Sequence, residues 1–226
     1  MYKKYKCVPT IEESVNVLRK DGVFIVENFL NPSDLKILHD EVKDLCISKG
    51  GHYEFGRNYR GDSLESHRDK RTLYKYYSSD WISKLTESFT GKRYLKDSVF
   101  ATYDYLSDRG IARNGFLHFD RLHCLKFFVY LVDVDEKNGA FTCCVGSNSK
   151  GRELRENSWD NSSGYDQVKN RPGIDFPDIA ALYPETPVKE KAGSLIVFDT
   201  DTFHRGGLVN PGEERLVVRL HKYTNR

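Results

Sequence analysis

The spacing of hydrophobic and polar positions predicts three helices before Gly91. Apolar side chains recur there at intervals of three and four residues, and each run follows a residue that favours a helix start. A short apolar run at residues 23–26 predicts a buried strand between the first two helices. The residues that mark the helix ends are Thr10 with Glu13 (a capping box), Gly22, Asn31 with Pro32, Gly50 and Ser79.

After Gly91 the pattern changes to apolar runs of strand length, separated by Gly, Asn, Asp and Pro. Helices followed by strands predict an antiparallel double sheet with helices packed on its outside. We expect one domain over residues 1–226, with N-terminal helices at about 10–90 and a strand core at about 95–226. The predicted strands are Val99–Leu106, Cys124–Val134, Ala140–Val145, Ser194–Asp199 and Leu216–Tyr223.

Two segments lack a clear period. Residues 51–77 are polar, basic and rich in tyrosine, and we expect a long loop that passes over one face of the fold. Residues 150–187 are also polar, with scattered aromatic side chains. Loops of that length are uncommon in a compact domain and often close over an active site, so residues 150–187 are a candidate lid.

Composition and charge exclude several classes of function. Lys and Arg number 35 against 33 Asp and Glu, and the net charge of +2 gives no strong attraction to nucleic acid or to a membrane surface. No run approaches the roughly 20 apolar residues of a membrane helix, and no apolar stretch follows the basic start MYKKYK. We expect a cytoplasmic protein that acts on a small molecule, and the sequence gives no oligomeric state.

The cysteines do not form the pattern of a disulfide framework or a zinc ribbon, because their number is odd and no C-x-x-C pair occurs. We expect them to be small hydrophobic residues in a reducing compartment. They are Cys7, Cys46, Cys124, Cys143 and Cys144.

The main chemical signal is the segment GFLHFDRLHCLKFFVYL, where His118 and Asp120 lie beside a run of strand-forming residues. Side chains at i and i+2 of an extended chain project from the same face. A second apolar strand, SLIVFDTDTFHRGG, leads to His204. If the two strands face each other, two imidazoles and one carboxylate converge and leave three positions of a metal open. That donor set suits iron(II), a chelating cosubstrate and O2.

A His-x-Asp pair also occurs by chance. His67 and Asp69 form a second copy in a polar stretch with no apolar strand to hold it. A histidine at the end of a strand is often only hydrogen-bonded, so His118 and Asp120 alone are a weak signal. The residues around the final strand strengthen it.

Arg215 follows His204 by eleven residues, where a turn leads into that strand. An arginine that faces into a barrel requires an anion, and its planar fork matches a carboxylate. We expect the anion to be the distal carboxylate of 2-oxoglutarate. Arg219 shares the same strand face and is the fallback anchor; the alternative for either arginine is a surface ion pair with Glu213 or Glu214.

At this point the chain resembles the phytanoyl-CoA dioxygenase family of iron(II)- and 2-oxoglutarate-dependent oxygenases. The resemblance runs through DGVFIVENFLNPSDLKILHDEV, the HFD motif, NGAFTCCVGSNSKG and AGSLIVFDTDTFHRGGLVNPGEERLVVRLHKY. It implies a mainly β fold with flanking helices, a double-stranded β-helix (jelly roll, cupin-like). It also implies His118, Asp120 and His204 as iron ligands and Arg215 as the cosubstrate anchor. The implied cofactors are Fe(II), 2-oxoglutarate and O2.

The chain departs from the family pattern at three positions. Val145 stands where proline is usual, Asn148 where histidine is usual, and Leu117 where a tryptophan often precedes the first ligand. These departures concern the substrate more than the metal. Related halogenases have a small residue in place of Asp120, so an intact aspartate favours hydroxylation, with release of succinate and CO2.

Two alternatives stay open at this stage, one within enzymes and one of a different class. The same centre could desaturate, epoxidise or cyclise its substrate, and a jelly roll could also be a non-catalytic binding or sensor module that retains a metal. Further candidate residues each have an ordinary structural alternative. They are His123 as an extra ligand, Tyr103, Tyr105 and Lys126 near the cosubstrate, Arg113 and Asn114 near the substrate, and a basic loop with Arg57, Arg60, Arg68 and Arg71.

Overall fold

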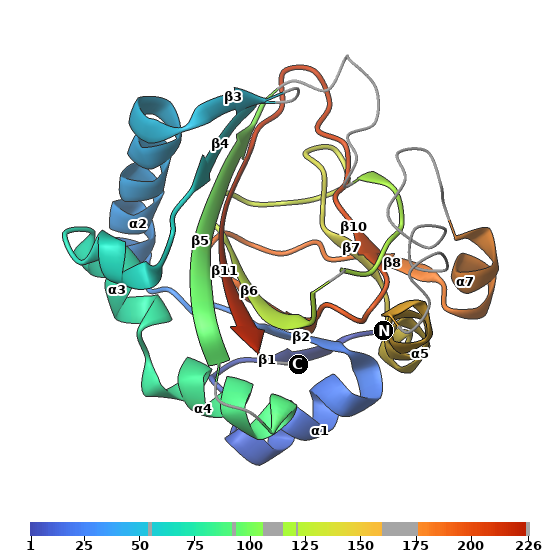
Figure 1. Cartoon of the computed structure of the whole chain (residues 1–226). Coiled ribbons are helices and arrows are strands. Elements are labelled where there is room, and N and C mark those ends of the chain that lie inside the picture. Colours follow the sequence, from blue (N-terminus) through green and yellow to red (C-terminus); the bar gives the residue numbers. More distant parts are fainter. Residues whose placement is uncertain (54–55, 92–93, 106–114, 121, 160–175, 225–226) are drawn as a thin grey trace.

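The computed structural model describes the chain except for residues 54–55, 92–93, 106–114, 121, 160–175 and 225–226. A large sheet and a small sheet face each other, with helices packed outside the large one (Figure 1). The large sheet has the strand order β1-β2-β9-β6-β11-β5-β4-β3, and the small sheet has the order β10-β7-β8. The predicted mainly β, jelly-roll-like fold with flanking helices is therefore confirmed.

The strands of both sheets pair antiparallel, apart from β1 with β2. The strands are β1 (Lys3–Tyr5), β2 (Val23–Val26), β3 (Gly51–Tyr53), β4 (Gly56–Arg60), β5 (Tyr94–Asp104), β6 (Cys124–Tyr130), β7 (Thr142–Cys144), β8 (Glu185–Pro187), β9 (Leu195–Asp199), β10 (His204–Arg205) and β11 (Arg215–Thr224). The helices are α1 (Ile11–Asp21), α2 (Pro32–Asp44), α3 (Arg71–Tyr77), α4 (Asp80–Thr90), α5 (Asn148–Trp159) and α7 (Pro177–Leu182), with the π-helix η1 (Leu45–Lys49) and the 3-10 helix η2 (Leu64–His67).

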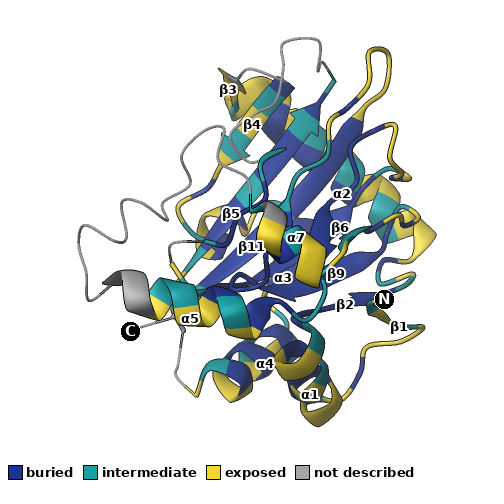
Figure 2. Cartoon of the chain, turned by 90° about the vertical axis from the view of Figure 1, so that its right-hand side faces the viewer, coloured by how far each residue is buried: buried dark blue, intermediate teal, exposed yellow. Residues whose placement is uncertain are grey.

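The alternation of side chains along β6 divides the interior into two layers. Phe127 and Val129 point toward α1–α4 and belong to the larger core, which lies between those helices and the large sheet. Phe128 and Tyr130 point the other way and pack between the two sheets. Both faces of β6 are therefore buried, as Figure 2 shows for the strands at the centre of the large sheet.

β11 lies at the centre of the large sheet, between β5 and β6. Leu216, Val218 and Leu220 face the helices. The intervening positions, which include Arg215 and Arg219, face the space between the sheets and line a pocket there. The same alternation that buries the apolar face thus carries two arginines into the interior.

Helix α1 begins and ends at the predicted residues. Thr10 forms a reciprocal capping box with Glu13, and Gly22 ends the helix in the left-handed region at φ 75°. A Cβ on Gly22 would lie 2.1 Å from Oγ1 of Thr202. Only glycine therefore allows the end of α1 to pack against the turn after β9, which leads to His204.

The prediction of a long loop at residues 51–77 is wrong. This segment contains β3, β4, η2 and α3. β3 and β4 lie at the edge of the large sheet, where one face meets solvent, so their sequence has no continuous apolar run. The expected loop at 150–187 is also wrong where the structure describes it, because α5, α7 and β8 occupy most of those positions.

The second helix ends at Gly50, as predicted. It is α-helical to Asp44 and continues as the π-helix η1 to Lys49. Among the helices described, none combines the length and the apolar character that crossing a membrane requires.

Substitution of Phe127 by alanine tests the core between the helices and the large sheet. Phe127 is fully buried and meets Trp81 edge-on, with ring centroids 6.4 Å apart. We expect Phe127→Ala to lower the free energy of unfolding by about 3–5 kcal/mol, measured by denaturant titration. Ile37→Ala on the exposed side of α2 is the control, with an expected change within about 0.5 kcal/mol. Equal losses in the two variants would contradict the placement of this core.

Candidate metal site and its pocket

A short backbone bridge brings together the three residues that the sequence singled out. The amide of His118 donates to the carbonyl of His204 at 2.9 Å, and the reverse hydrogen bond is 2.7 Å long. The amide of Asp120 donates to the carbonyl of Thr200 at 3.0 Å. One oxygen of Asp120, Oδ1, then lies 3.8 Å from Nε2 of His118 and 3.6 Å from Nε2 of His204.

Both imidazoles are oriented by backbone carbonyls. Nδ1 of His118 lies 2.7 Å from the carbonyl oxygen of Phe116, and Nδ1 of His204 lies 2.7 Å from that of Thr202. A nitrogen that close to a carbonyl carries the hydrogen, so Nε2 of each ring presents its lone pair to the cluster. Burial also lowers the pKa of His204 well below its usual value, which keeps this ring neutral.

The carboxylate of Asp120 is held from its other side by Lys126. Nζ of Lys126 lies 2.5 Å from Oδ2, while Oδ1 faces the two imidazoles. Burial alone would raise the pKa of Asp120, but the positive charge of Lys126, together with the two histidines, lowers it below its usual range. Two neutral imidazoles and one ionised carboxylate, with donor atoms within 4.8 Å of one another, fit a divalent metal of the iron(II) type.

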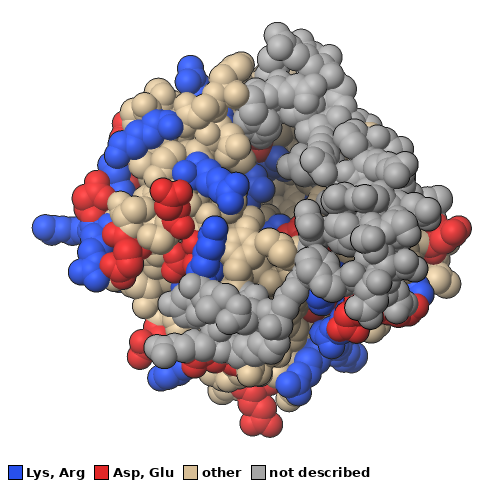
Figure 3. All heavy atoms as spheres, in the orientation of Figure 1, with Lys and Arg blue, Asp and Glu red and all other residues tan. Residues whose placement is uncertain are grey.

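The cluster lies at one end of a pocket between the two sheets. Figure 3 shows a hollow on the face turned toward the viewer, with Lys and Arg side chains gathered at its edge. Aromatic and basic side chains form most of the wall. The lining residues are His118, Lys126, Phe128, Tyr130, Phe141, His204, Arg205, Gly206, Arg215, Val217 and Arg219.

Arg215 lies on the pocket wall, as the sequence predicted, but it is engaged by another residue of the chain. Its Nε and Nη2 donate to Oδ2 of Asp104 at 2.9 and 2.7 Å, and its Nη1 donates to the carbonyl of Gly139. The proposed surface partners, Glu213 and Glu214, do not form this ion pair. The carboxylate comes instead from the position directly opposite Arg215 on β5.

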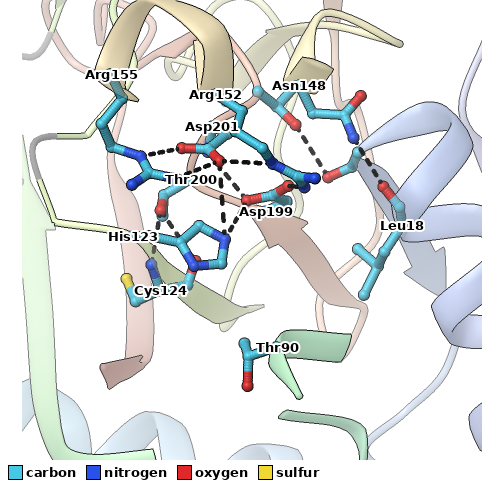
Figure 4. Close-up of polar contacts among 12 residues, drawn as sticks. Leu18, Thr90, His123, Cys124, Asn148, Arg152, Arg155, Asp199, Thr200 and Asp201 are labelled. Carbon is cyan, nitrogen blue, oxygen red and sulfur yellow. Dashed lines mark hydrogen bonds and ion pairs between the residues drawn. The ribbon is translucent and has the colours of Figure 1, made fainter. Parts of the chain in front are cut away.

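A second cluster of charged side chains supports the turn before His204 (Figure 4). Asp199 and Asp201 are fully buried, and Arg152 and Arg155 point toward them from α5. Arg155 donates to both oxygens of Asp201, at 2.7 and 2.8 Å. Arg152 lies 3.5 Å from Asp201 and 3.8 Å from Asp199.

His123 completes this second cluster, with Nε2 3.0 Å from Oδ1 of Asp199. It is therefore not an additional ligand of the first cluster. One histidine and two carboxylates could also hold a cation. Two arginines already balance the two aspartates, so the arrangement is an ion-pair network that joins α5 to the end of β9.

The remaining candidates have structural contacts. The hydroxyl of Tyr103 donates to Glu214 at 2.7 Å, and Arg68 pairs with Glu65 on the surface. Nε2 of His67 lies 2.7 Å from the hydroxyl of Tyr59. Asn148 donates to the carbonyls of Leu18 and Arg19 at the end of α1, at 3.1 and 3.2 Å. Arg113 and Asn114 lie outside the described residues.

Sequence reasoning did not single out Asp104, Asp199, Asp201 or Arg155. The acidic pair in FDTDTFH was a usable signal, because two aspartates that end a buried strand require partners. Asp104 gave no such signal, since its role depends on the register of β5 against β11.

Substitution of Arg155 by methionine tests the network. It would leave the buried carboxylate of Asp201 with only the more distant Arg152 and His123, so we expect the free energy of unfolding to fall by about 2–4 kcal/mol in denaturant titration. Lys150→Met removes an exposed ion pair from the same helix and is expected to cost less than about 0.5 kcal/mol. An unchanged free energy of unfolding in Arg155→Met would show that the network does not stabilise the fold.

Comparison with known proteins agrees with the geometry. The sequence model of the family described as Phytanoyl-CoA dioxygenase (PhyH) matches residues 112–214. No curated protein matches the chain at a significant level. The family match spans all three members of the cluster and ends one residue before Arg215.

Solved structures share the fold at low sequence identity. The epimerase SnoN from nogalamycin biosynthesis, in complex with Fe3+, alpha ketoglutarate and nogalamycin RO, has a TM-score of 0.66 and 17% identity, with coverage of 95% of this chain and 83% of SnoN. The alpha ketoglutarate-dependent carbocyclase SnoK has a TM-score of 0.64 and 16% identity, with coverage of 96% and 87%. EctD from S. alaskensis has a TM-score of 0.65 and 11% identity, with coverage of 93% and 76%.

These likenesses confirm the fold predicted from the sequence, and the family match confirms the predicted resemblance. The match to the phytanoyl-CoA dioxygenase family model covers residues 112–214, the part of the chain that holds His118, Asp120 and His204.

Proposed function

We propose that the chain is an iron(II)- and 2-oxoglutarate-dependent oxygenase that hydroxylates a small molecule and releases succinate and CO2. The observation that carries this proposal is the convergence of Nε2 of His118, Nε2 of His204 and Oδ1 of Asp120 at one end of a pocket with basic walls. A facial set of two histidines and one carboxylate leaves positions open for a chelating cosubstrate and O2. The complex of SnoN with Fe3+ and alpha ketoglutarate supports the same cofactors here.

In this proposal His118, Asp120 and His204 hold the iron, which supplies the oxidative chemistry when it is bound. Lys126 fixes the second oxygen of Asp120, so that the carboxylate offers one oxygen to the metal. Phe141 and Phe198 pack against His204, with ring centroids 5.8 and 5.0 Å from its ring. These rings exclude water from one side of the site and limit the ways in which His204 can turn.

The proposed position of the cosubstrate follows from the two ends of the pocket. Its keto acid end would lie at the metal, and its distal carboxylate would reach the arginines on β11. Arg215 follows His204 by eleven residues, the position at which the family resemblance implies the anchor of this carboxylate. Because Asp104 already accepts from this guanidinium, a ligand at Arg215 must share it with Asp104.

The oxidative outcome is proposed to be hydroxylation, and a second outcome has specific support. SnoN is an epimerase and SnoK a carbocyclase on a similar fold, so rearrangement or ring closure of the substrate is the second candidate. Product analysis by mass spectrometry separates these from hydroxylation, because only hydroxylation adds one oxygen atom to the substrate.

Two further proposals concern the surroundings of the site. Of the candidate lid at 150–187, residues 160–175 lie outside the described residues. We propose that α7 covers the site, because the ring centroid of Phe176, just before α7, lies 6.4 Å from that of Phe119 and 5.0 Å from that of Phe203, next to the metal-binding residues. A cytoplasmic location is proposed because all five cysteines are free thiols, which suits a reducing compartment.

Anaerobic titration with iron(II) and then 2-oxoglutarate tests the proposed function. We expect a weak visible charge-transfer band in the wild type. Asp120→Ala should lose the band and more than about 100-fold in iron affinity, since it removes the charged ligand. Asp40→Ala, an exposed site on α2, is the matched control and should retain both.

Chelation of the metal should remove the band from the wild type, and addition of iron(II) should restore it. A wild type that binds iron without any response to 2-oxoglutarate would be a metal-binding jelly roll of another function. A wild type that binds neither would contradict the oxygenase proposal.

A further inference from the structure

Arg219 is the basic residue of the pocket whose charge is least satisfied. Its Nη2 donates to the hydroxyl of Thr102 at 2.8 Å, and its guanidinium lies over the ring of Phe128, 5.2 Å from the ring centroid. Its Nε is buried and has no hydrogen-bond partner among the described residues. The side chain is thus positioned by a hydroxyl and an aromatic ring, while most of its donors are left for another group.

The other basic residues of the pocket each have a carboxylate. Lys126 contacts Asp120. Arg205 pairs with Glu185. Arg215 pairs with Asp104 at 2.7 Å. Within the described part of the chain, Arg219 forms no such ion pair.

Arg215 and Arg219 therefore differ in what they can offer a ligand, although both face the pocket from β11. Arg215 directs Nε and Nη2 at Asp104 and Nη1 at the carbonyl of Gly139. Arg219 directs one nitrogen at Thr102, and its buried Nε has no hydrogen-bond partner among the described residues. A planar guanidinium with adjacent free donors matches a carboxylate in bidentate fashion.

The surroundings of Arg219 make the unpaired charge costly. Burial lowers the pKa of Arg219 to about 10; the negative charge of Asp104, which forms no ion pair with Arg219, acts against this shift, and the like charge of Arg215 adds to it. His221, two residues further along the same face of β11, is also buried and has an unpartnered Nε2 among the described residues. Its ring is stacked on those of Phe100 and Phe128, at centroid distances of 4.4 and 6.3 Å. An anion at this position would supply the missing partner of Arg219.

We infer that Arg219 binds a carboxylate group of a ligand in this pocket. Two ligands could bring it: the cosubstrate, through its distal carboxylate, or a substrate that is itself a small carboxylic acid. In the first case Arg215 is a structural residue that joins β11 to β5 through Asp104. In the second case Arg215 anchors the cosubstrate, and the substrate is a carboxylic acid whose carboxylate binds to Arg219. The identity of the ligand in both cases rests on the proposed function. The inference that Arg219 binds a carboxylate does not depend on it.

The first arm of the test compares 2-oxoglutarate with 2-oxopentanoate, which lacks the distal carboxylate. Both are titrated into the anaerobic iron(II) protein, and the visible band is recorded. The wild type should prefer 2-oxoglutarate by about 10- to 100-fold, as expected for a hydrogen-bonded charge pair. Loss of this preference in Arg219→Met, with its retention in Arg215→Met, assigns the cosubstrate carboxylate to Arg219.

The second arm applies when Arg219→Met retains that preference. The protein saturated with iron and 2-oxoglutarate is titrated calorimetrically with small carboxylic acids and with their amides. A preference for the acids that is present in the wild type and lost in Arg219→Met assigns the carboxylate to the substrate. Retention of both preferences in Arg219→Met, or their absence from the wild type, overturns the inference.

A metal-free titration separates this inference from the proposed function. If the wild type gives no band with iron and 2-oxoglutarate, calorimetry with glutarate on the metal-free protein still tests Arg219. Binding by the wild type that is lost in Arg219→Met and partly restored in Arg219→Lys supports carboxylate binding without the oxygenase. No binding by the wild type, or equal binding by the variant, overturns it. Arg68→Met on the surface is the matched control and should bind like the wild type.

Thermal melting distinguishes a lost contact from a damaged fold. Arg219→Met removes a buried charge that has no carboxylate partner, so its melting temperature should equal or exceed that of the wild type. Arg215→Met removes the guanidinium that pairs with the buried carboxylate of Asp104 and should melt at a lower temperature. A folded, stable Arg219→Met with unchanged ligand binding would leave Arg219 with no role in the pocket.

Discussion

The pair of backbone hydrogen bonds between His118 and His204 is the interaction on which the site depends. It joins the segment that leads into β6 of the large sheet to the first residue of β10 in the small sheet. The two histidines are far apart in the sequence, and this backbone pairing brings them side by side. Because the bridge fixes both backbones, and carbonyl oxygens fix both Nδ1 atoms, the two imidazoles present the same nitrogen to one point. Asp120 then meets them through Oδ1.

Electrostatic pairing explains how the surroundings of this bridge tolerate so many buried charges. Asp201 is matched by Arg155, Asp104 by Arg215 and Asp120 by Lys126. Each pair also links separate parts of the fold: α5 to the turn after β9, β5 to β11, and the segment at Asp120 to β6. A buried pair contributes little net stability, but removal of one partner is costly, so these contacts specify where the elements lie. Arg219 departs from this rule and therefore indicates where a ligand anion belongs.

Much of this arrangement could be predicted from local patterns in the sequence. The cap at Thr10, the stop at Gly22 and the central strands followed from spacing and residue type. The two-residue period of a strand predicted that His118 and Asp120 share a face, whereas their convergence with His204 required two strands to face each other, an arrangement that the family resemblance supplied together with the fold. Their role as iron ligands, like that of Arg215 as the cosubstrate anchor, is still a prediction.

What the sequence could not show depends on register and on sheet edges. β3 and β4 were missed because an edge strand with a solvated face carries no apolar run. The partner of Arg215 was missed because nothing local places Asp104 opposite it. Helix α5 was missed because its contacts to Asp201 are polar, and an apolar period is the usual signal of a packed helix.

The most direct test of the central claim is the position of the metal in crystals of the iron-loaded protein, measured by anomalous scattering at the iron absorption edge. We expect one strong peak among Nε2 of His118, Oδ1 of Asp120 and Nε2 of His204. A peak at His123, Asp199 and Asp201 instead, or no peak at either cluster in iron-loaded crystals, would contradict it.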